Sequence, residues 1–370
     1  MYNSAIKVLK MLEEHGFKAY IVGGFVRDLI INRKSSDIDI CTNAKPKEIK
    51  EIFKNVILKK EQYGSVTLVI NQVTFEITTF RKDLKYENNR LPVKIKYINS
   101  LQEDLKRRDF TMNTICMDSN GNIIDMLNAK TDLENKIIKT VGPARVKLSE
   151  DSLRILRAIR FSTILDFDLD KDLIKYIVKY KKLLRKLSYY RKKEELDKIF
   201  SSPNKKKGIN LLIELDLLDD LDIMRLNRVQ ITKDAIGIWT QLNVDKKYSF
   251  TNNELEQMKQ IRIVSKLEKI DNFVLYQYGL YVCTVACEIR KEDTKNIAKN
   301  YMKLPIKNKN EINISAMEIC NILSLKPSML INEIYKDLEK QIINKKIINE
   351  KKNIEEYIIK KYKKIWYNLY

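Results

Sequence analysis

Length, composition and charge already narrow what this chain can be. It has 370 residues, 44% of them hydrophobic, which is enough for about two to four folded units with real cores and excludes a disordered chain. Lys and Arg total 70 against 49 Asp and Glu, and the net charge of +21 favours a polyanionic partner, either nucleic acid or an anionic membrane. A Lys-rich background composition also contributes to this excess. The single histidine, His15, excludes Ser-His-Asp and Cys-His triads and histidine metal clusters.

Cysteine usage and the lack of long apolar runs bear on location. The sequence contains no apolar run of about 18 residues and no signal-peptide pattern at its N-terminus, so we expect a soluble, cytoplasmic protein without a membrane partner. Of the five cysteines, Cys283 and Cys287 lie one helical turn apart, but no second pair completes a zinc set. We expect free, mostly buried thiols in a reducing compartment.

The N-terminal segment combines a helix, a strand and a glycine turn. Apolar spacing predicts an amphipathic helix over residues 3–15 and a short buried strand over residues 19–22. The glycines Gly23 and Gly24 follow, and a double glycine before a helix lets the backbone approach a phosphate closely. Arg27 lies one turn into that helix, within reach of an anion. A tight turn with a surface Arg–Asp pair is the plainer explanation of this segment taken alone.

Two carboxylates follow on the next predicted strand, residues 37–41. Asp37 and Asp39 share one face of the strand because side chains alternate, and Ile38 and Ile40 face the core. Adjacent like charges need a cation, and hard oxygen ligands favour magnesium or calcium over zinc. Most isolated pairs of this kind lie in solvated turns or on exposed strand faces. Whether this pair binds a metal therefore depends on the neighbouring motifs.

The segment after the carboxylate pair predicts the rest of a small mixed sheet. A helix is expected over residues 46–53, and strands over 66–70 and 73–80 should form a hairpin around Asn71 and Gln72. Glu76 on the second of these strands is either a third metal carboxylate or, slightly preferred, a solvated strand residue. Residues 81–92 are polar and are interpreted as a functional loop.

A basic cluster leads into the next predicted elements. Residues 103–113 contain Arg107-Arg108-Asp109, and Asp109 is a candidate N-cap for a following helix. Short strands over 115–117 and 123–125 flank Asn120-Gly121, a strong hairpin signal.

Residues 150–165 predict one continuous helix with a charged face. At 100° per residue, Asp151, Arg154 and Arg157 occupy one arc, apolar side chains fill the opposite arc, and Arg160 falls at the border. Such spacing is commonly a solvated face with ion pairs. Displayed together, an Asp and two Arg can also read a base edge with paired donors and acceptors.

Helical periodicity dominates the chain beyond about residue 170. Helices are expected over 172–180, 188–200 and 205–215, and the segment 332–370 is rich in lysine. This segment is either an RNA-binding surface or a lysine-rich amphipathic covering of a core. The aromatic residues interleaved in it are Tyr335, Tyr357, Tyr362, Trp366 and Tyr367.

Three motifs in order resemble the class II nucleotidyltransferases, the bacterial CCA-adding enzymes and their poly(A) polymerase relatives. Gly23-Gly24-x-x-Arg27-Asp28 with Asp37-x-Asp39 resembles the catalytic signature of that family. Residues 107–113 are similar to its ribose-recognition segment, and residues 150–161 to its nucleotide-selecting helix. The match covers about residues 19–200, roughly half the chain. It implies an α+β fold, with a small mixed β-sheet head domain followed by an all-α neck, body and tail. The domains expected from it are 1–137, 138–202, 203–265 and 266–370.

The resemblance also implies roles for individual residues. Asp37 and Asp39 would hold two Mg²⁺ ions, Gly24 and Arg27 would contact the triphosphate, and Arg108 would lie beside the nucleotide sugar. Phosphoryl transfer of this kind needs metals and cations but no histidine.

The nucleotide-selecting helix would supply the remaining contacts. Asp151 and Arg154 would bond the Watson–Crick edge of the incoming C or A without a nucleic-acid template. Arg157 and Arg160 would help to hold the nucleotide and its phosphates. One departure is Tyr190, which stands where the family usually has Glu, and this puts a stabilising contact of the neck in doubt.

The implied activity is addition of C, C and A to the 3′ end of tRNA from CTP and ATP. Addition of A alone and general polyadenylation are alternatives, and a catalytically dead RNA-binding module is an alternative from another class. Addition of CC alone is disfavoured because the segment 81–92, with Arg90, is present at full length.

Overall fold

A computed structural model describes residues 2–35, 37–70, 72–87 and 91–363. The chain divides into two compact units, Met1–Met224 and Arg225–Tyr370. The four-part division expected from the resemblance stays a prediction. Asn71, Arg90, Trp366 and Tyr367, which the sequence singled out, lie outside the described residues.

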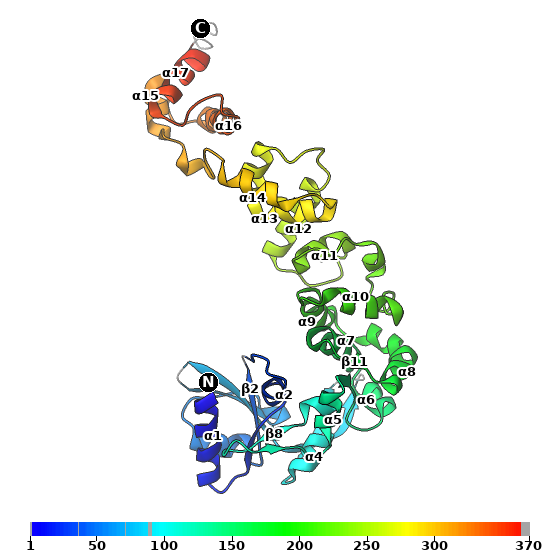
Figure 1. The fold of residues 1–370 in the computed structure, drawn as a ribbon. Helices are drawn as coiled ribbons and strands as arrows, with labels where there is room; N and C mark the ends of the chain where they lie inside the picture. The colour runs from blue at the N-terminus through cyan, green and yellow to red at the C-terminus, as the bar shows by residue number, and fades with distance from the viewer. Residues whose placement is uncertain (1, 36, 71, 88–90, 364–370) are drawn as a thin grey trace. The chain divides into compact units, whose positions relative to one another are not determined.

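A mixed sheet forms the centre of the N-terminal part of the first unit (Figure 1). The strand order is β3-β4-β5-β2-β1-β8-β9. β2 pairs with β5 in parallel and with β1 in antiparallel register, so the predicted mixed sheet is confirmed. The strands are β1 (Ala19–Val22), β2 (Ile38–Thr42), β3 (Val56–Lys60), β4 (Ser65–Ile70), β5 (Val73–Thr79), β8 (Cys116–Met117) and β9 (Ile123–Ile124).

Alternating apolar residues attach the sheet to its helices. Ile38 and Ile40 of β2 are buried, as predicted, while Asp39 between them is exposed. Helix α1 (Tyr2–Glu14) contacts β1, β2 and α3 (Pro46–Ile52), burying Val8, Leu9 and Leu12. Burial of one helix face against the sheet explains why the 3.6-residue spacing of the N-terminus identified this helix correctly.

Within the segment 81–92, the described residues 81–87 and 91–92 are strand, so the prediction of a loop is wrong for them. They contribute to a separate two-stranded sheet of β6 (Arg81–Glu87) and β7 (Leu91–Tyr97), paired in antiparallel register with Arg81 opposite Tyr97. The second strand carried a signal in its alternation of apolar and polar residues over 91–97. The many charged residues obscured it, because a two-stranded ribbon needs no continuous apolar face.

Asp109 is not the N-cap of a helix, so this prediction is also wrong. After α4 (Leu101–Lys106) the chain forms only a 3₁₀ turn, Thr111–Asn113, with Phe110 in the capping position. Phe110 instead forms a β-bridge with Thr140. The carboxylate of Asp109 accepts hydrogen bonds from the side chains of Asn113 and of Arg157, which lies 48 residues away, and local spacing could not show the second of these partners.

The predicted helix over 150–165 corresponds to α7 (Leu153–Leu165), which begins three residues later than expected, after a break from the preceding helix. Helix α6 (Ala144–Glu150) ends at Asp151, whose backbone is extended, and α7 begins after Ser152. The Asp151 carboxylate accepts a hydrogen bond from the backbone N–H of Leu153 at 3.0 Å. Aspartate competes for backbone donors in this way, and it therefore starts a helix here instead of continuing one.

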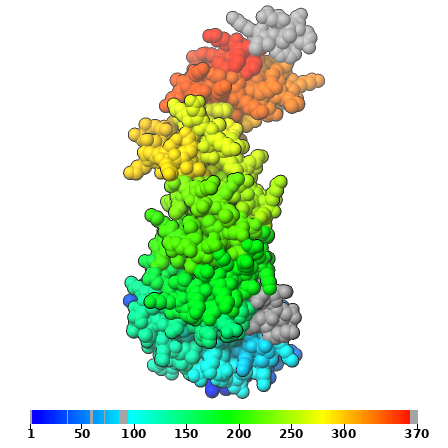
Figure 2. Space-filling model, turned by 90° about the vertical axis from the view of Figure 1, so that its right-hand side faces the viewer, coloured from blue at the N-terminus to red at the C-terminus, as the bar shows by residue number. Residues whose placement is uncertain are grey.

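The helices that follow α7 form the remainder of the first unit. Helix α7 packs against α9 and α10, and these helices are drawn in green in Figure 2. The short strands β10 (Ile137–Ile138) and β11 (Asp168–Leu169) pair in parallel beside it. The other elements are α5 (Ala129–Glu134), α8 (Lys171–Tyr180), α9 (Tyr189–Phe200) and α10 (Lys205–Glu214).

The second unit contains only helices among its described residues, as the periodicity predicted. Its core is apolar and includes Ile261, Cys283, Ile319 and Leu338, all buried. Across the residues that the structure describes, no helix is both long and apolar enough to cross a membrane. Its helices are α11 (Ala235–Leu242), α12 (Asn252–Val264), α13 (Asn272–Arg290), α14 (Thr294–Met302), α15 (Ala316–Leu323), α16 (Met329–Ile343) and α17 (Lys351–Ile358).

Candidate active site

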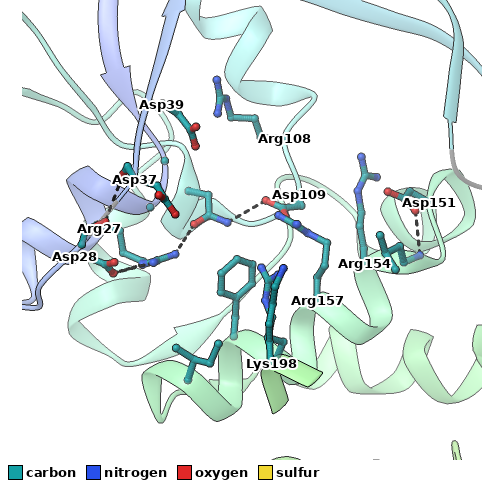
Figure 3. Close-up of a pocket in the computed structure, with 18 of the residues that line it drawn as sticks. Arg27, Asp28, Asp37, Asp39, Arg108, Asp109, Asp151, Arg154, Arg157 and Lys198 are labelled. Carbon is teal, nitrogen blue, oxygen red and sulfur yellow. Dashed lines mark hydrogen bonds and ion pairs between the residues drawn. The ribbon is translucent and has the colours of Figure 1, made fainter. Parts of the chain in front are cut away.

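A polar cavity of about 760 Å³ lies in the first unit, between the edge of the sheet and helix α7 (Figure 3). Every residue that the sequence predicted for the site lines this cavity. These residues are Gly24, Arg27, Asp37, Asp39, Arg108, Asp151, Arg154, Arg157 and Arg160. Residues up to about 130 positions apart in sequence therefore meet in one place, although their individual roles remain predictions.

The carboxylate pair lies at the start of β2, close to the glycine turn. Asp37 directly precedes the strand and Asp39 lies on it, and both are exposed. Gly23 has φ +83°, and a Cβ atom there would lie 3.7 Å from Oδ2 of Asp39. Only glycine adopts this conformation without strain, so Gly23 lets the chain turn from β1 into α2 (Gly24–Ile30) beside the carboxylates.

The two carboxylates fit a hydrated divalent cation. Mg²⁺ keeps several water ligands and is commonly held by one or two carboxylates together with substrate phosphates. Glu76 is the register partner of Asp39 on β5, and its carboxylate accepts a hydrogen bond from the Ser65 hydroxyl at 3.2 Å. No group of three His, Cys, Asp or Glu side chains suited to a metal occurs among the described residues, which gives Glu76 no support as a third ligand.

A chain of hydrogen bonds runs from the glycine turn to α7. The Arg27 guanidinium donates to Asp28 at 2.7 Å and to Oδ1 of Asn113 at 2.8 Å. The Asn113 amide donates to Asp109 at 3.1 Å, and Arg157 donates to the other oxygen of Asp109 at 2.8 Å. Arg157 in α7 is thereby linked to Arg27 beside the carboxylates, through side chains only.

The carboxyl group of Asp109 is ionised within this series of hydrogen bonds. Burial by itself would raise the pKa of its carboxyl group, but Arg157 and the hydrogen bonds from Asn113 and the backbone of Phe110 hold the pKa well below its ordinary value. An ionised carboxylate accepts from both Arg157 and Asn113, which fixes their positions at the cavity wall.

Three arginines of the cavity lie around the aromatic ring of Phe161. The guanidinium groups of Arg27 and Arg157 each lie 5.4 Å from the ring centroid of Phe161, and that of Arg160 lies 4.2 Å from it. Phe110 contacts the same ring edge-on at 5.7 Å. Because an aromatic face attracts cations, Phe161 offsets part of the repulsion among three arginines.

The far end of the cavity holds Arg154 and Asp151. Arg154 donates to the backbone carbonyl of Lys147 at 2.7 Å and to Glu150 at 2.9 Å, and it is only 6% exposed. The bond between Asp151 and the N–H of Leu153 fixes the carboxylate at the start of α7 (Figure 3). The break between α6 and α7 thus places an acceptor and a donor together at one wall.

Comparison with known proteins identifies the family. The chain is 32% identical over 390 residues to a CCA-adding enzyme of Geobacillus sp. (strain WCH70), covering 97% of this chain and 96% of the relative. It is 32% identical to the CCA-adding enzyme of Ligilactobacillus salivarius (strain UCC118), covering 96% and 95%. The chain belongs to the CCA-adding enzyme family.

Domain families and solved structures agree with this membership. The family "Poly A polymerase head domain" matches residues 19–139, and "Probable RNA and SrmB-binding site of polymerase A" matches residues 166–221. A tRNA nucleotidyltransferase domain 2 family matches residues 242–358. The crystal structure of the Bacillus stearothermophilus CCA-adding enzyme in complex with CTP superposes with a TM-score of 0.83 at 26% identity, covering 99% of each chain. The resemblance and the fold class predicted from sequence are confirmed.

Tyr190, which stands where the CCA-adding family usually has Glu, does not disturb the ion pair between the neighbouring helices α7 and α9. Tyr190 is 57% exposed, while Glu195, one turn further along α9, pairs with Arg160 of α7 at 3.0 Å. Burial, together with the positive charge of Arg157, lowers the pKa of Arg160 to about 10 although Glu195 attracts its charge. Helices α7 and α9 therefore remain joined by a buried ion pair.

Sequence reasoning missed several residues of the site. Asn113 and Phe161 lay inside the quoted motifs but received no role, although both contact Arg27. Asp104 lay outside the motifs and pairs with Arg107 and Arg108 at i+3 and i+4. That spacing within one helical turn was the available signal, because such pairs face each other.

Proposed function

We propose that this protein adds C, C and A to the 3′ end of tRNA, using CTP and ATP and releasing pyrophosphate. One observation carries the proposal: a single cavity joins the carboxylate pair of β2 to the donor and acceptor at the start of α7. A transferase that selects its nucleotide without a template needs its reaction centre and its base-reading groups in the same site. Membership of the CCA-adding enzyme family supports the same activity.

The reaction centre consists of Asp37 and Asp39, which would hold Mg²⁺. A bound metal of this kind activates the attacking hydroxyl and stabilises charge on the leaving pyrophosphate. The cations around the carboxylates then bind the triphosphate and orient it for in-line attack. Gly24 allows a close backbone approach, and Arg27, held by Asp28 and Asn113, presents its guanidinium from a fixed position.

Base selection follows from the hydrogen-bonding pattern that C and A share. Each has an exocyclic amino group beside an unprotonated ring nitrogen, so each offers a donor next to an acceptor. U and G offer the reverse, a carbonyl beside a ring N–H. The Asp151 carboxylate would accept from the amino group, and Arg154 would donate to the ring nitrogen. One pair of side chains thus accepts both correct bases and rejects both others.

The remaining arginines hold the nucleotide in place. Arg157 and Arg160 face the cavity from successive turns of α7 and would bind the nucleotide and its phosphates. Arg108 would lie beside the sugar. Binding of tRNA would involve the lysine-rich C-terminal part of the chain, because lysine side chains neutralise backbone phosphates and release their counterions. The five cysteines are free and buried in the described structure, consistent with a cytoplasmic location.

The test is incubation of a tRNA ending at its discriminator base with CTP, ATP and Mg²⁺. We expect exactly three residues to be added, with A last, and product length is resolved on a sequencing gel. A single added A would indicate an A-adding enzyme. A long ladder of A on generic RNA would indicate polyadenylation. Tight tRNA binding without any incorporation would indicate a non-catalytic RNA-binding module.

A further inference from the structure

One carboxylate behind the cavity wall binds three arginines from two separate segments of the site. Asp104 of α4 is fully buried. Its Oδ1 accepts hydrogen bonds from Nε of Arg107 at 2.8 Å and from the backbone N–H of Arg81 at 3.1 Å. Its Oδ2 accepts from Nη2 of Arg108 at 3.1 Å. Arg81 begins the β6–β7 ribbon, and Arg81, Arg107 and Arg108 all line the cavity, whereas Asp104 does not.

This carboxylate is ionised in the folded protein. Burial by itself would raise its pKa, but the positive charges of Arg107 and Arg108 and the N–H of Arg81 bring the pKa below its ordinary value. A charge buried this completely is tolerated only when it is paired and hydrogen-bonded on both oxygens. Asp104 therefore has a fixed position, and the arginines bound to it are fixed with it.

The orientation of Arg108 depends on this anchor. Its Nε is buried and has no hydrogen-bond partner within the part of the chain that the structure describes. The hydrogen bond from its Nη2 to Asp104 is therefore what sets the direction of the guanidinium, which faces the cavity that also contains Asp37 and Asp39 (Figure 3). A long side chain without that bond would sample other rotamers.

We propose that Asp104 is a positioning residue for recognition of the nucleotide sugar. It acts through Arg108, which it holds toward the sugar of the bound nucleotide, and it ties the first residue of the β6–β7 ribbon to the same point. The inference rests on the proposed function and deepens it, because it identifies which group sets the preference for ribonucleotides. Asp104 does not line the cavity and is not a catalytic residue.

The neighbouring acidic residue supplies a matched control. Glu103 precedes Asp104 on the same helix, but its side chain is exposed and pairs with Lys106 at 2.6 Å. The variants Asp104→Asn and Glu103→Gln each remove one negative charge from α4 with almost no change in side-chain volume. They differ only in whether the charge lost is the buried one that holds Arg108.

The experiment measures kcat/KM for CTP and for 2′-deoxy-CTP with the full-length protein and a tRNA lacking its terminal CCA. For Asp104→Asn we expect the CTP to 2′-deoxy-CTP ratio to fall about tenfold, mainly through a higher KM for CTP, because a misplaced donor no longer distinguishes the 2′-hydroxyl. For Glu103→Gln we expect a ratio within about twofold of wild type. Asp104→Glu, which keeps the charge on a longer stem, should fall between Asp104→Asn and wild type.

The outcomes separate positioning from simple stabilisation. Equal losses with both nucleotides, leaving the ratio unchanged, would show that Asp104 is only structural and would overturn the inference. If Asp104→Asn fails to fold in a thermal melt, the ratio for Asp104→Glu decides, and a wild-type ratio overturns the inference. If wild type and Glu103→Gln add no nucleotide at all, the proposed function itself is wrong, which is a distinguishable result.

Discussion

The two units of the chain treat charge in opposite ways. In the first unit, charged side chains enter the interior, each with a partner or a backbone acceptor. In the second unit, no charged side chain is buried among the described residues, and the core contains Ile261, Ile319 and Leu338 among other apolar groups. The buried charged residues are Arg27, Asp28, Asp104, Lys147, Arg154, Arg160, Lys192, Glu195, Lys205 and Asp220.

We expect this difference to separate a reaction site, whose side chains must have fixed positions, from a surface of the second unit that binds RNA phosphates. A buried ion pair contributes little net stability, because desolvation opposes the attraction, but it fixes the relative positions of its partners. The pair between Arg160 and Glu195 illustrates this at the cavity. Exposed lysines such as Lys345 and Lys346 remain hydrated and can bind phosphates without an organised site. Reaction chemistry is thus expected to depend on single residues of the first unit, and RNA affinity on the summed charge of the second.

Loss of a carboxylate proposed to bind the metal should have the largest effect on the reaction of the first unit. In Asp39→Asn we expect nucleotide incorporation to fall by at least about a hundredfold, because the neutral amide binds a divalent cation poorly. Binding of tRNA should remain nearly unchanged, and a filter-binding titration measures it beside the incorporation assay. The control is Glu51→Gln, an exposed carboxylate on α3. Incorporation within tenfold of wild type would contradict the metal assignment of Asp39.

Removal of the proposed base-reading donor should produce the second largest effect. In Arg154→Ala we expect discrimination of CTP against UTP to fall by about 1–3 kcal/mol, the usual value of a bidentate base contact. Competition between the two nucleotides in single-turnover reactions measures this directly. Arg145→Ala, which removes an exposed arginine from α6, is the matched control. If Arg154→Ala retained full discrimination against both UTP and GTP, the readout role would be wrong.

The sequence predicted the local and periodic parts of this structure well. Strand alternation placed Asp39 on an exposed face with Ile38 and Ile40 beneath it, and helical spacing located α1, α8, α9 and α10. Both patterns follow from burial of one face of an element, which a single sequence records directly. The motif residues also proved to line one cavity.

Most of the errors and omissions have one cause, which is pairing between polar groups that lie far apart in the sequence. The missed pairs of Asp104 are the exception, because they are local. Asp109 looked like a helix cap because its partner Arg157 lies 48 residues away. Asn113 received no role because its bonds to Arg27 and Asp109 exist only in the folded site. Charged residues concealed the β6 strand in the same way, since pairing with β7 is a backbone property. Such contacts depend on tertiary geometry and leave no period in the sequence.

Removal of lysines from the second unit should weaken RNA binding without affecting the chemistry. In Lys345→Gln/Lys346→Gln we expect the slope of log binding constant against log salt concentration to become shallower by about 1 to 2, since each phosphate contact contributes roughly one unit. Titrations with tRNA at several salt concentrations give the slope. The matched variant Lys7→Gln/Lys10→Gln removes two exposed charges from α1. Identical slopes in both variants and wild type would mean that this lysine pair has only a structural role.

The smallest effect should appear in the pH dependence of stability at the buried Lys147. Its ammonium group donates to the backbone carbonyl of Lys106 at 2.7 Å, and burial, reinforced by the charge of Arg154, lowers its pKa to about 8. An unfolded lysine keeps the ordinary pKa of 10.5, so between pH 8 and 10.5 the unfolded state binds more protons than the folded state. Raising the pH through this window therefore relieves the penalty of burying the charge and increases the free energy of unfolding.

This dependence compares a buried lysine of the first unit with an exposed one of the second. Relative to Lys147→Met, wild type should gain on the order of 1 kcal/mol in free energy of unfolding from pH 8 to 10.5, measured by urea titration at each pH. Lys346→Met, which removes an exposed lysine of the second unit, is the matched control. A constant difference between wild type and Lys147→Met would show that Lys147 is not desolvated in the folded protein. The contrast between buried and surface charge would then rest on the arginines and carboxylates alone.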